Sequence, residues 1–183
     1  ELLIEAYDIL KRLVEGYPNE SIINQAILTA KEISIDLGKV DDFVKWLSLA
    51  NVSYLSENQI QTAAFRSAEK LYLSDKKKSA RKALENYINK YPNGSNLLKI
   101  NFYLAEIFFD LKKWDQSLEY YYKIVSFPIN EFSEIALVNS AHILTILKRE
   151  NESISILENL EENAQFSKNR HFAQLNLMKI FFK

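Results

Sequence analysis

The stretch Leu104-Ala105-Glu106-Ile107-Phe108-Phe109 has a counterpart in Leu177-Met178-Lys179-Ile180-Phe181-Phe182, with residues of similar type in the same order. The two stretches lie 73 residues apart, which is one step of 36 plus one of 37. Four stretches of the chain have similar residue patterns when one is aligned with the next by a shift of about 36 residues. A fixed period in the thirties is typical of solenoids built from helical hairpins. It therefore predicts an all-α repeat protein and favours the binding of partners over catalysis.

The composition fits a helical protein with a large core. The chain has 183 residues, of which 48% are apolar, and only 3 Gly and 3 Pro, so little turn chemistry is present for an all-β fold. The net charge of −1 argues against nucleic acid, whose binding domains are usually basic. No apolar run approaches the roughly 18 residues of a membrane span. The absence of cysteine excludes disulfides and thiolate metal sites.

Aromatic-proline pairs mark the ends of helices. Tyr17-Pro18-Asn19 and Tyr91-Pro92-Asn93 are identical and lie 74 residues apart, and Phe127-Pro128 follows 36 residues after Tyr91-Pro92. Proline cannot continue a helix, so each pair predicts a helix end. Between these ends, apolar residues recur at helical spacing, and we expect ten helices. They are placed near 2–16, 20–36, 40–52, 57–73, 77–90, 96–112, 114–126, 131–148, 151–163 and 168–183.

Polar residues before three of these helices predict their starts. Ser56 and Gln59 have the spacing of a capping box, and Asn130 and Ser167 are expected N-caps. The lysine-rich loop at 74–78 is interpreted as slightly longer than its counterparts, so the repeat period is expected to slip there.

Residues 102–125 resemble a tetratricopeptide repeat (TPR). In this family the first helix of each hairpin, helix A, carries a Leu-small pair and then an aromatic one turn later, as in Leu104-Ala105 and Phe108. The second, helix B, opens with an aromatic residue and then places a small, an aliphatic and an aromatic residue at set spacings. Trp114, Ser117, Leu118 and Tyr121 fit that pattern. The small residues let the two helices approach closely where they cross.

The resemblance extends over most of the chain and is strongest over residues 80–160. A second unit matches at Ala141, Leu144, Ser153, Ile154, Leu157 and Leu160. A weaker one matches at Ala68, Leu71, Ala83, Leu84 and Tyr87, and a degenerate one at Ala30, Ile33, Leu37-Gly38 and Trp46. The resemblance implies one domain over residues 1–183, a right-handed superhelix of about five hairpins, acting as a non-enzymatic protein-interaction scaffold.

The Tyr-Pro-Asn boundaries look like a variant found in bacterial envelope proteins, such as outer-membrane assembly lipoproteins and Tol-Pal coordination proteins. The bias to Lys, Asn, Ile and Tyr resembles that of AT-rich bacterial genomes. These features leave the compartment open between periplasm, outer membrane and cytoplasm. The final apolar helix lacks the polar character of a solenoid cap, so we expect a piece of a longer protein. We also expect a homodimer through residues 1–14 or 170–183, because exposed apolar faces attract partners.

No residue pattern points to catalysis, a metal or a cofactor. The two histidines, His142 and His171, lack a neighbouring ligand at metal-binding spacing. Asp41-Asp42 and Glu161-Glu162 are adjacent carboxylates, which on an exposed helix lack the convergent geometry of an acid-base pair. The basic cluster at 76–78 is interpreted as a solvated loop.

Helix-A residues form the predicted partner-binding groove, because helices A line the concave surface of TPR solenoids. Its two apolar rows would be Phe65, Phe102, Val138 and Leu175, and Tyr72, Phe109, Thr145 and Phe182. Such a groove suits a peptide or a helix of a protein partner. The predicted contact residues are Phe65, Arg66, Glu69, Tyr72, Phe102, Tyr103, Glu106, Phe109, Asn139 and His142. The alternatives are that these aromatic residues belong to the core, that the chain self-assembles, or that it is an accessory domain of a larger protein.

Overall fold

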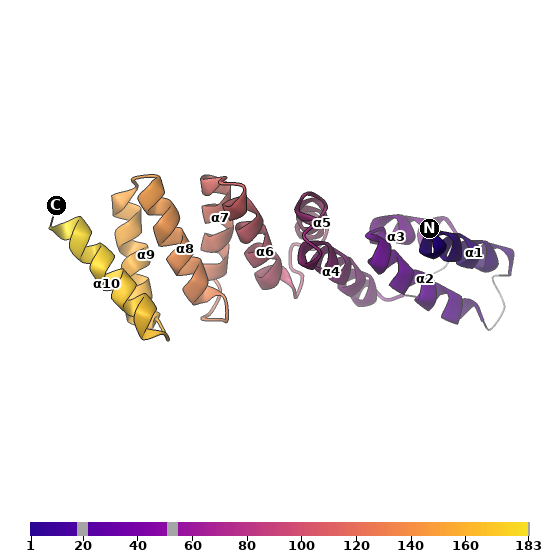
Figure 1. Ribbon diagram of the computed structural model, residues 1–183. Coiled ribbons are helices and arrows are strands. Elements are labelled where there is room, and N and C mark those ends of the chain that lie inside the picture. Colours follow the sequence, from indigo (N-terminus) through magenta and orange to yellow (C-terminus); the bar gives the residue numbers. More distant parts are fainter. Residues whose placement is uncertain (18–21, 51–54, 183) are drawn as a thin grey trace. The chain divides into compact units, whose positions relative to one another are not determined.

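The computed structural model describes residues 1–17, 22–50 and 55–182, and in these ranges it contains ten α-helices and no strand (Figure 1). The chain divides into two compact units, Glu1–Gly94 and Ser95–Lys183. The all-α prediction is confirmed. The single domain expected over residues 1–183 stays a prediction.

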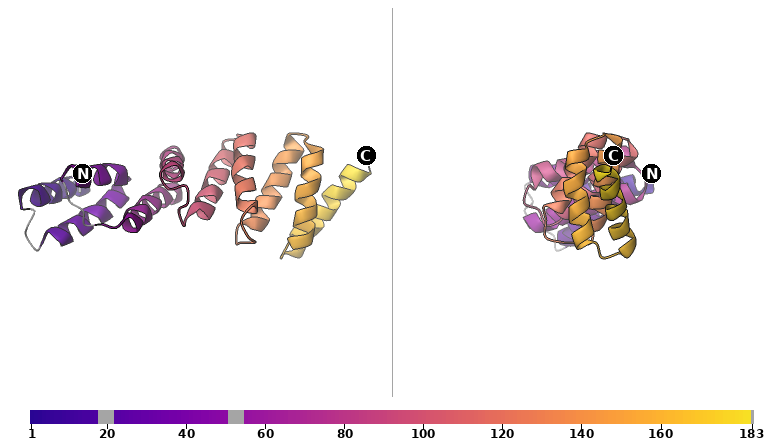
Figure 2. Two further views of the ribbon diagram at one scale, coloured as in Figure 1. Left: turned by 180° about the vertical axis from the view of Figure 1, so that it is seen from behind. Right: turned by 90° about the vertical axis from the view of Figure 1, so that its left-hand side faces the viewer.

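Consecutive helices pair within each unit. Unit 1 contains α1 (Leu2–Gly16), α2 (Ile23–Leu37), α3 (Val40–Leu49), α4 (Glu57–Leu73) and α5 (Lys77–Lys90). Unit 2 contains α6 (Leu97–Asp110), α7 (Trp114–Val125), α8 (Ser133–Ile146), α9 (Glu150–Asn163) and α10 (Ser167–Phe181). Helices α4 and α5, α6 and α7, and α8 and α9 pack as antiparallel hairpins, and α10 packs on α9 (Figure 2). These bounds agree with the predicted helices to within a few residues.

The repeat period is visible in the backbone. The residues just after α2, α4, α6 and α8 have positive φ angles of 70°, 56°, 55° and 56°, and they are Gly38, Asp75, Lys112 and Lys148. Their spacings are 37, 37 and 36 residues. A left-handed residue after a helix lets the next N–H groups satisfy its last carbonyl groups. Helices α2, α4, α6 and α8 therefore end alike and take the helix-A position, and the odd-numbered helices that follow them take the helix-B position.

The predicted slip of the period in the loop at 74–78 is wrong. Ala80, Ser117 and Ser153 each lie five residues after a left-handed residue, and they are 0%, 0% and 2% exposed. Ala80 is thus the small helix-B residue of its hairpin, whereas the predicted Ala83 is half-buried. The error arose because the loop was taken to extend to Lys78, whereas α5 begins at Lys77, as the predicted helix at 77–90 does.

Helix A and helix B approach closely where their small residues meet. Ala105 on α6 is fully buried, and the Ser117 hydroxyl on α7 donates to its carbonyl oxygen at 2.9 Å. Because neither residue has a long side chain, the two backbones can lie near each other. Ala141 on α8 and Ser153 on α9 are buried at the equivalent positions.

One predicted helix start is confirmed and two are wrong. Ser56 caps α4, because its hydroxyl accepts from the Gln59 N–H and the Gln59 side chain accepts from the Ser56 N–H at 2.9 Å. Asn130 lies ahead of α8 and instead accepts from the Phe132 N–H at 2.9 Å, which forms a turn. Ser167 is the first residue of α10 rather than its cap.

The aromatic-proline boundaries follow helix ends as predicted. Tyr91 comes directly after α5, and Phe127 lies two residues beyond the end of α7. Tyr17 follows α1, while Pro18 and Asn19 lie outside the described residues.

Replacing Ala105 with Leu should overpack the crossing of α6 and α7 and lower the free energy of unfolding by about 1–3 kcal/mol. Trp114 fluorescence during urea unfolding, in a Trp46→Phe background, reports unit 2 alone, because the chain has 2 tryptophans. The exposed Gln116→Leu on α7 is the control and should have little effect. An Ala105→Leu variant as stable as its parent would contradict the conclusion that α6 and α7 approach closely at Ala105.

Candidate partner-binding surface

In unit 1, the predicted contact residues on α4 are partly used by the core. Phe65 is 8% exposed, and its ring meets the Tyr87 ring edge-on with centroids 6.3 Å apart. It therefore offers little area to a partner. Glu69 and Tyr72 are half-buried.

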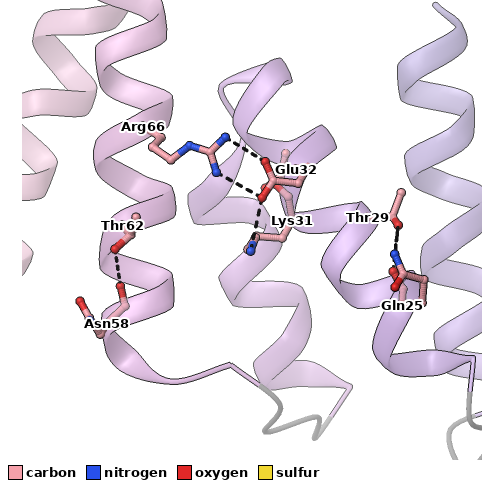
Figure 3. Close-up of polar contacts among 8 residues, drawn as sticks. Gln25, Thr29, Lys31, Glu32, Asn58, Thr62 and Arg66 are labelled. Atoms are coloured by element: carbon pink, nitrogen blue, oxygen red, sulfur yellow. Dashed lines mark hydrogen bonds and ion pairs between the residues drawn. The ribbon is translucent and has the colours of Figure 1, made fainter.

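Arg66 on α4 forms an ion pair with the neighbouring helix A, α2. Its guanidinium nitrogens lie 3.2 and 3.0 Å from the two carboxylate oxygens of Glu32 on α2, and Lys31 approaches the same carboxylate at 3.3 Å (Figure 3). One turn further, Lys70 on α4 pairs with Asp36 at 2.7 Å. Two ion pairs therefore join α2 and α4, and the predicted binding residue Arg66 already has a partner within the fold.

The Glu32 carboxyl has a lowered pKa. Burial would raise it, but the hydrogen bonds from Arg66 and Lys31 and their charges outweigh burial. A lowered folded pKa gives stability that is present above the ordinary value of 4.5 and is lost as the pH falls through the folded value.

Glu32→Gln should reduce the stability of unit 1 at pH 7 by less than about 1 kcal/mol, because both partners are half exposed and screened by water. The difference from the parent should shrink at pH 3 and in high salt. Trp46 fluorescence in a Trp114→Phe background would follow unit 1 alone. A difference that persisted unchanged at pH 3 would argue against the ion pair as its cause.

In unit 2, two of the predicted aromatic residues on α6 have one side against the core. Phe102 stacks on Phe132 with ring centroids 4.4 Å apart, and Phe109 meets Trp114 edge-on at 5.4 Å. Both rings are half-buried, so each keeps part of its surface accessible. Tyr103, by contrast, is only 6% exposed.

Three helices of unit 2 meet in a polar cluster that includes two predicted contact residues. The Tyr121 hydroxyl on α7 donates to the Glu106 carboxylate on α6. The Asn139 amide on α8 donates to the Tyr121 oxygen at 2.8 Å and to Glu106 at 3.2 Å. Burial, followed by the hydrogen bond to Glu106, raises the pKa of Tyr121. The cluster ties α6, α7 and α8 together, while Glu106 and Asn139 remain half-buried and can face a ligand.

His142, the last predicted contact residue, is exposed on α8, and its ring lies 4.9 Å from the ring of Phe172 on α10.

A hollow of about 780 Å³ lies in unit 2 beside the N-terminal half of α8. The connection between α7 and α8, the end of α9 and the connection to α10 form its other walls. Four partly or largely exposed apolar side chains line it: Phe127 (38% exposed), Ile129 (70%), Ile135 (43%) and Phe166 (60%). Of the ten predicted contact residues, Asn139 lines the hollow. Of the four exposed apolar residues, Ile135 lies on α8, whereas Phe127, Ile129 and Phe166 lie in helix connections. Large apolar residues in those connections were the sequence signal that could have located the hollow.

The wall formed by the connection to α10 is fixed in place. The carboxylate of Glu134 on α8 accepts from the N–H groups of Gln165 (3.3 Å) and Phe166 (3.2 Å) and from the Asn169 amide (2.8 Å). The hollow is thus formed before any ligand arrives, which reduces the entropy lost on binding.

A tetratricopeptide repeat family model matches residues 53–94. This segment contains α4 and α5, so the match falls on a hairpin whose sequence resembled the family less strongly than residues 102–125 did. The match supports the TPR resemblance and a role as a protein-interaction scaffold, since TPR proteins are generally non-enzymatic interaction modules. A comparison with curated proteins gives no match.

The described part of the chain contains no group of three or more His, Asp or Glu side chains placed to hold a metal ion. Among its helices, none has both the length and the apolar character needed to cross a membrane.

Phe102→Ser should lower the free energy of unfolding of unit 2 by about 2 kcal/mol, because the half-buried ring loses its contact with Phe132. Phe102→Leu should lower the free energy of unfolding by less, since the leucine side chain retains apolar area. Urea unfolding followed by Trp114 fluorescence would compare them. Equal stability of the Ser variant and the parent would show that the ring is free of the core.

Proposed function

We propose that the chain is a non-enzymatic scaffold that binds an apolar peptide or helix of a protein partner on the helix-A face of unit 2. The observation that carries the proposal is the preformed hollow beside α8. Its volume of about 780 Å³ and its exposed aromatic and aliphatic side chains suit the burial of a few apolar residues from a ligand.

The hollow adjoins the predicted groove at α8. Val138 and Asn139 line the hollow and also belong to the predicted helix-A face. Next to them, the Asn139 amide donates a hydrogen bond to the Glu106 carboxylate. The half-buried Phe102 ring keeps part of its surface accessible. A ligand seated in the hollow could therefore extend along α8 toward α6, with apolar side chains in the hollow and N–H donors near Glu106.

A random twelve-residue peptide library displayed on phage tests this proposal without a known partner. The parent should enrich peptides rich in aliphatic and aromatic residues. Fluorescence anisotropy with one enriched peptide should then show binding at least about tenfold weaker for the double variant Ile129→Asp/Phe166→Asp, a loss of about 1.4 kcal/mol.

The matched control is Leu73→Asp, which also charges an exposed apolar residue, 71% exposed, but lies on α4 in unit 1. It should bind the peptide like the parent. Absence of enrichment, or equal binding by the double variant, would contradict a ligand site in the hollow.

The bacterial envelope-associated subtype is a finer part of the proposal. It is supported by the two identical Tyr-Pro-Asn boundaries. In the second of them, Tyr91 is 8% exposed and packs on Tyr87 with ring centroids 5.1 Å apart. Fractionation of cells producing the full-length protein would test it, and recovery in the cytosol alone would contradict it.

Self-assembly through the terminal helices is a second candidate function. Large apolar side chains are exposed on α1, including Leu2 (82%) and Ile9 (57%), and near the end of the chain, including Phe181 (63%) and Phe182 (86%). Burial of such side chains against a partner is favourable.

A further inference from the structure

The hollow beside α8 is surrounded by carboxylates that no basic side chain neutralises. Glu131 and Glu134 line it, and the Glu106 carboxylate lies 3.2 Å from the amide nitrogen of Asn139, which also lines it. Within the described part of the chain, none of these three carboxylates forms an ion pair. Among the described lining residues the only Lys or Arg is Lys168, whose side chain is exposed. The charges around the hollow thus favour a positively charged ligand.

The groups that hydrogen-bond to two of these carboxylates are neutral. The Glu134 carboxylate accepts from two backbone N–H groups and from the Asn169 amide. The Glu106 carboxylate accepts from the Tyr121 hydroxyl and the Asn139 amide. Neutral donors satisfy hydrogen-bonding capacity and hold the carboxylates in place, but they do not cancel the net negative charge. A cation from a ligand would therefore still be attracted to this part of unit 2.

The Glu106 carboxylate keeps one oxygen for a ligand. Tyr121 and Asn139 both donate to its Oε1 atom, and Oε2 accepts no hydrogen bond from the described residues. Glu106 is half-buried, and an unpaired charge is costly in such a place. The Asn139 nitrogen is directed at Glu106 and Tyr121, which leaves the Asn139 oxygen as a second acceptor. A donor with positive charge would gain a charge-assisted hydrogen bond here.

We propose that the ligand of this hollow is a peptide segment that carries a basic residue next to its apolar residues. The inference rests on the proposed function and specifies its ligand. The apolar residues contact Phe127, Ile129 and Phe166, and the basic group binds at Glu106 and Asn139. Arginine fits best, because its guanidinium has five N–H donors and can serve acceptors on two side chains, whereas the lysine ammonium is a compact point charge.

The same charges select against acidic ligands. A peptide carboxylate placed beside Glu106 or Glu131 would meet a like charge, and such a contact lowers affinity for the wrong partner. Lys168 does not remove this effect, because one cation stands against three carboxylates. The site therefore discriminates between apolar peptides by their charge, and the apolar contacts alone do not define its ligand.

The phage library used for the proposed function reports this charge preference directly. Peptides enriched on the parent should combine apolar residues with Arg or Lys, Arg being the more frequent, and should contain fewer Asp and Glu than the unselected library. Apolar peptides enriched without an excess of basic residues would overturn this inference, while the proposed function would stand. If no peptide is enriched, both are contradicted.

A pair of peptides isolates the charge: an enriched peptide with arginine, and its derivative with citrulline, which has the shape of arginine but no charge. In fluorescence anisotropy the parent should bind the arginine peptide about fivefold more tightly, and Glu106→Gln should bind both alike. The exposed Glu119→Gln on α7, outside the hollow, is the matched control and should keep the preference.

The comparison of the two peptides on the parent needs no variant, so it decides the question even if Glu106→Gln fails to fold. Equal binding of both peptides by the parent overturns the inference. A preference that persists undiminished in a folded Glu106→Gln variant, verified by circular dichroism, overturns it as well.

The double variant Ile129→Ser/Phe166→Ser removes apolar area without adding charge, so it should weaken the binding of both peptides to the same extent. If both bind as tightly as to the parent, the hollow is not the site, and the proposed function and this inference fail together. Sedimentation velocity tests another occupant. A parent that self-associates, with a double variant that does not, would place a second copy in the hollow and overturn the peptide ligand.

Discussion

The close crossing of a small helix-A residue with a small helix-B residue is the constraint on which the hairpins depend. At Ala105 and Ser117 the separation is short enough for the serine hydroxyl to bond the helix-A backbone at 2.9 Å. With the crossing fixed, the larger residues one turn away, such as Phe108 and Tyr121, are drawn into full contact and buried. The left-handed residue that ends each helix A then sets the distance to the next crossing.

The sequence predicted the features that depend on periodicity. The helix bounds and the capping box at Ser56 followed from residue spacing and proline positions, and the burial of Ala105 followed from the TPR resemblance. The wrong small residue at Ala83 followed from extending the preceding loop to Lys78, since lysine is compatible with either loop or helix. The misassigned cap at Asn130 reflects a turn that competes with the helix for the same backbone donors. Local residue preference cannot decide between such alternatives.

The candidate site was harder to predict than the fold, because residue type does not show whether a side chain is already engaged by the protein. Arg66 is a plausible ligand contact by sequence, yet Glu32 of the neighbouring helix binds it. Phe65 and Tyr103 lie at helix-A positions but are buried. The hollow beside α8 draws three of its four exposed apolar residues from helix connections, and its wall depends on Glu134, which bonds residues 31 to 35 positions away. That arrangement follows from tertiary packing.

The most direct test of this account is a set of nuclear Overhauser measurements between side-chain protons at the three small-residue crossings. The account predicts contacts of Ala68 with Ala80, Ala105 with Ser117, and Ala141 with Ser153, each displaced from the previous one by 36 or 37 residues. A contact of Ala68 with Ala83 in place of Ala80, or the absence of contacts at two of the three crossings, would contradict it.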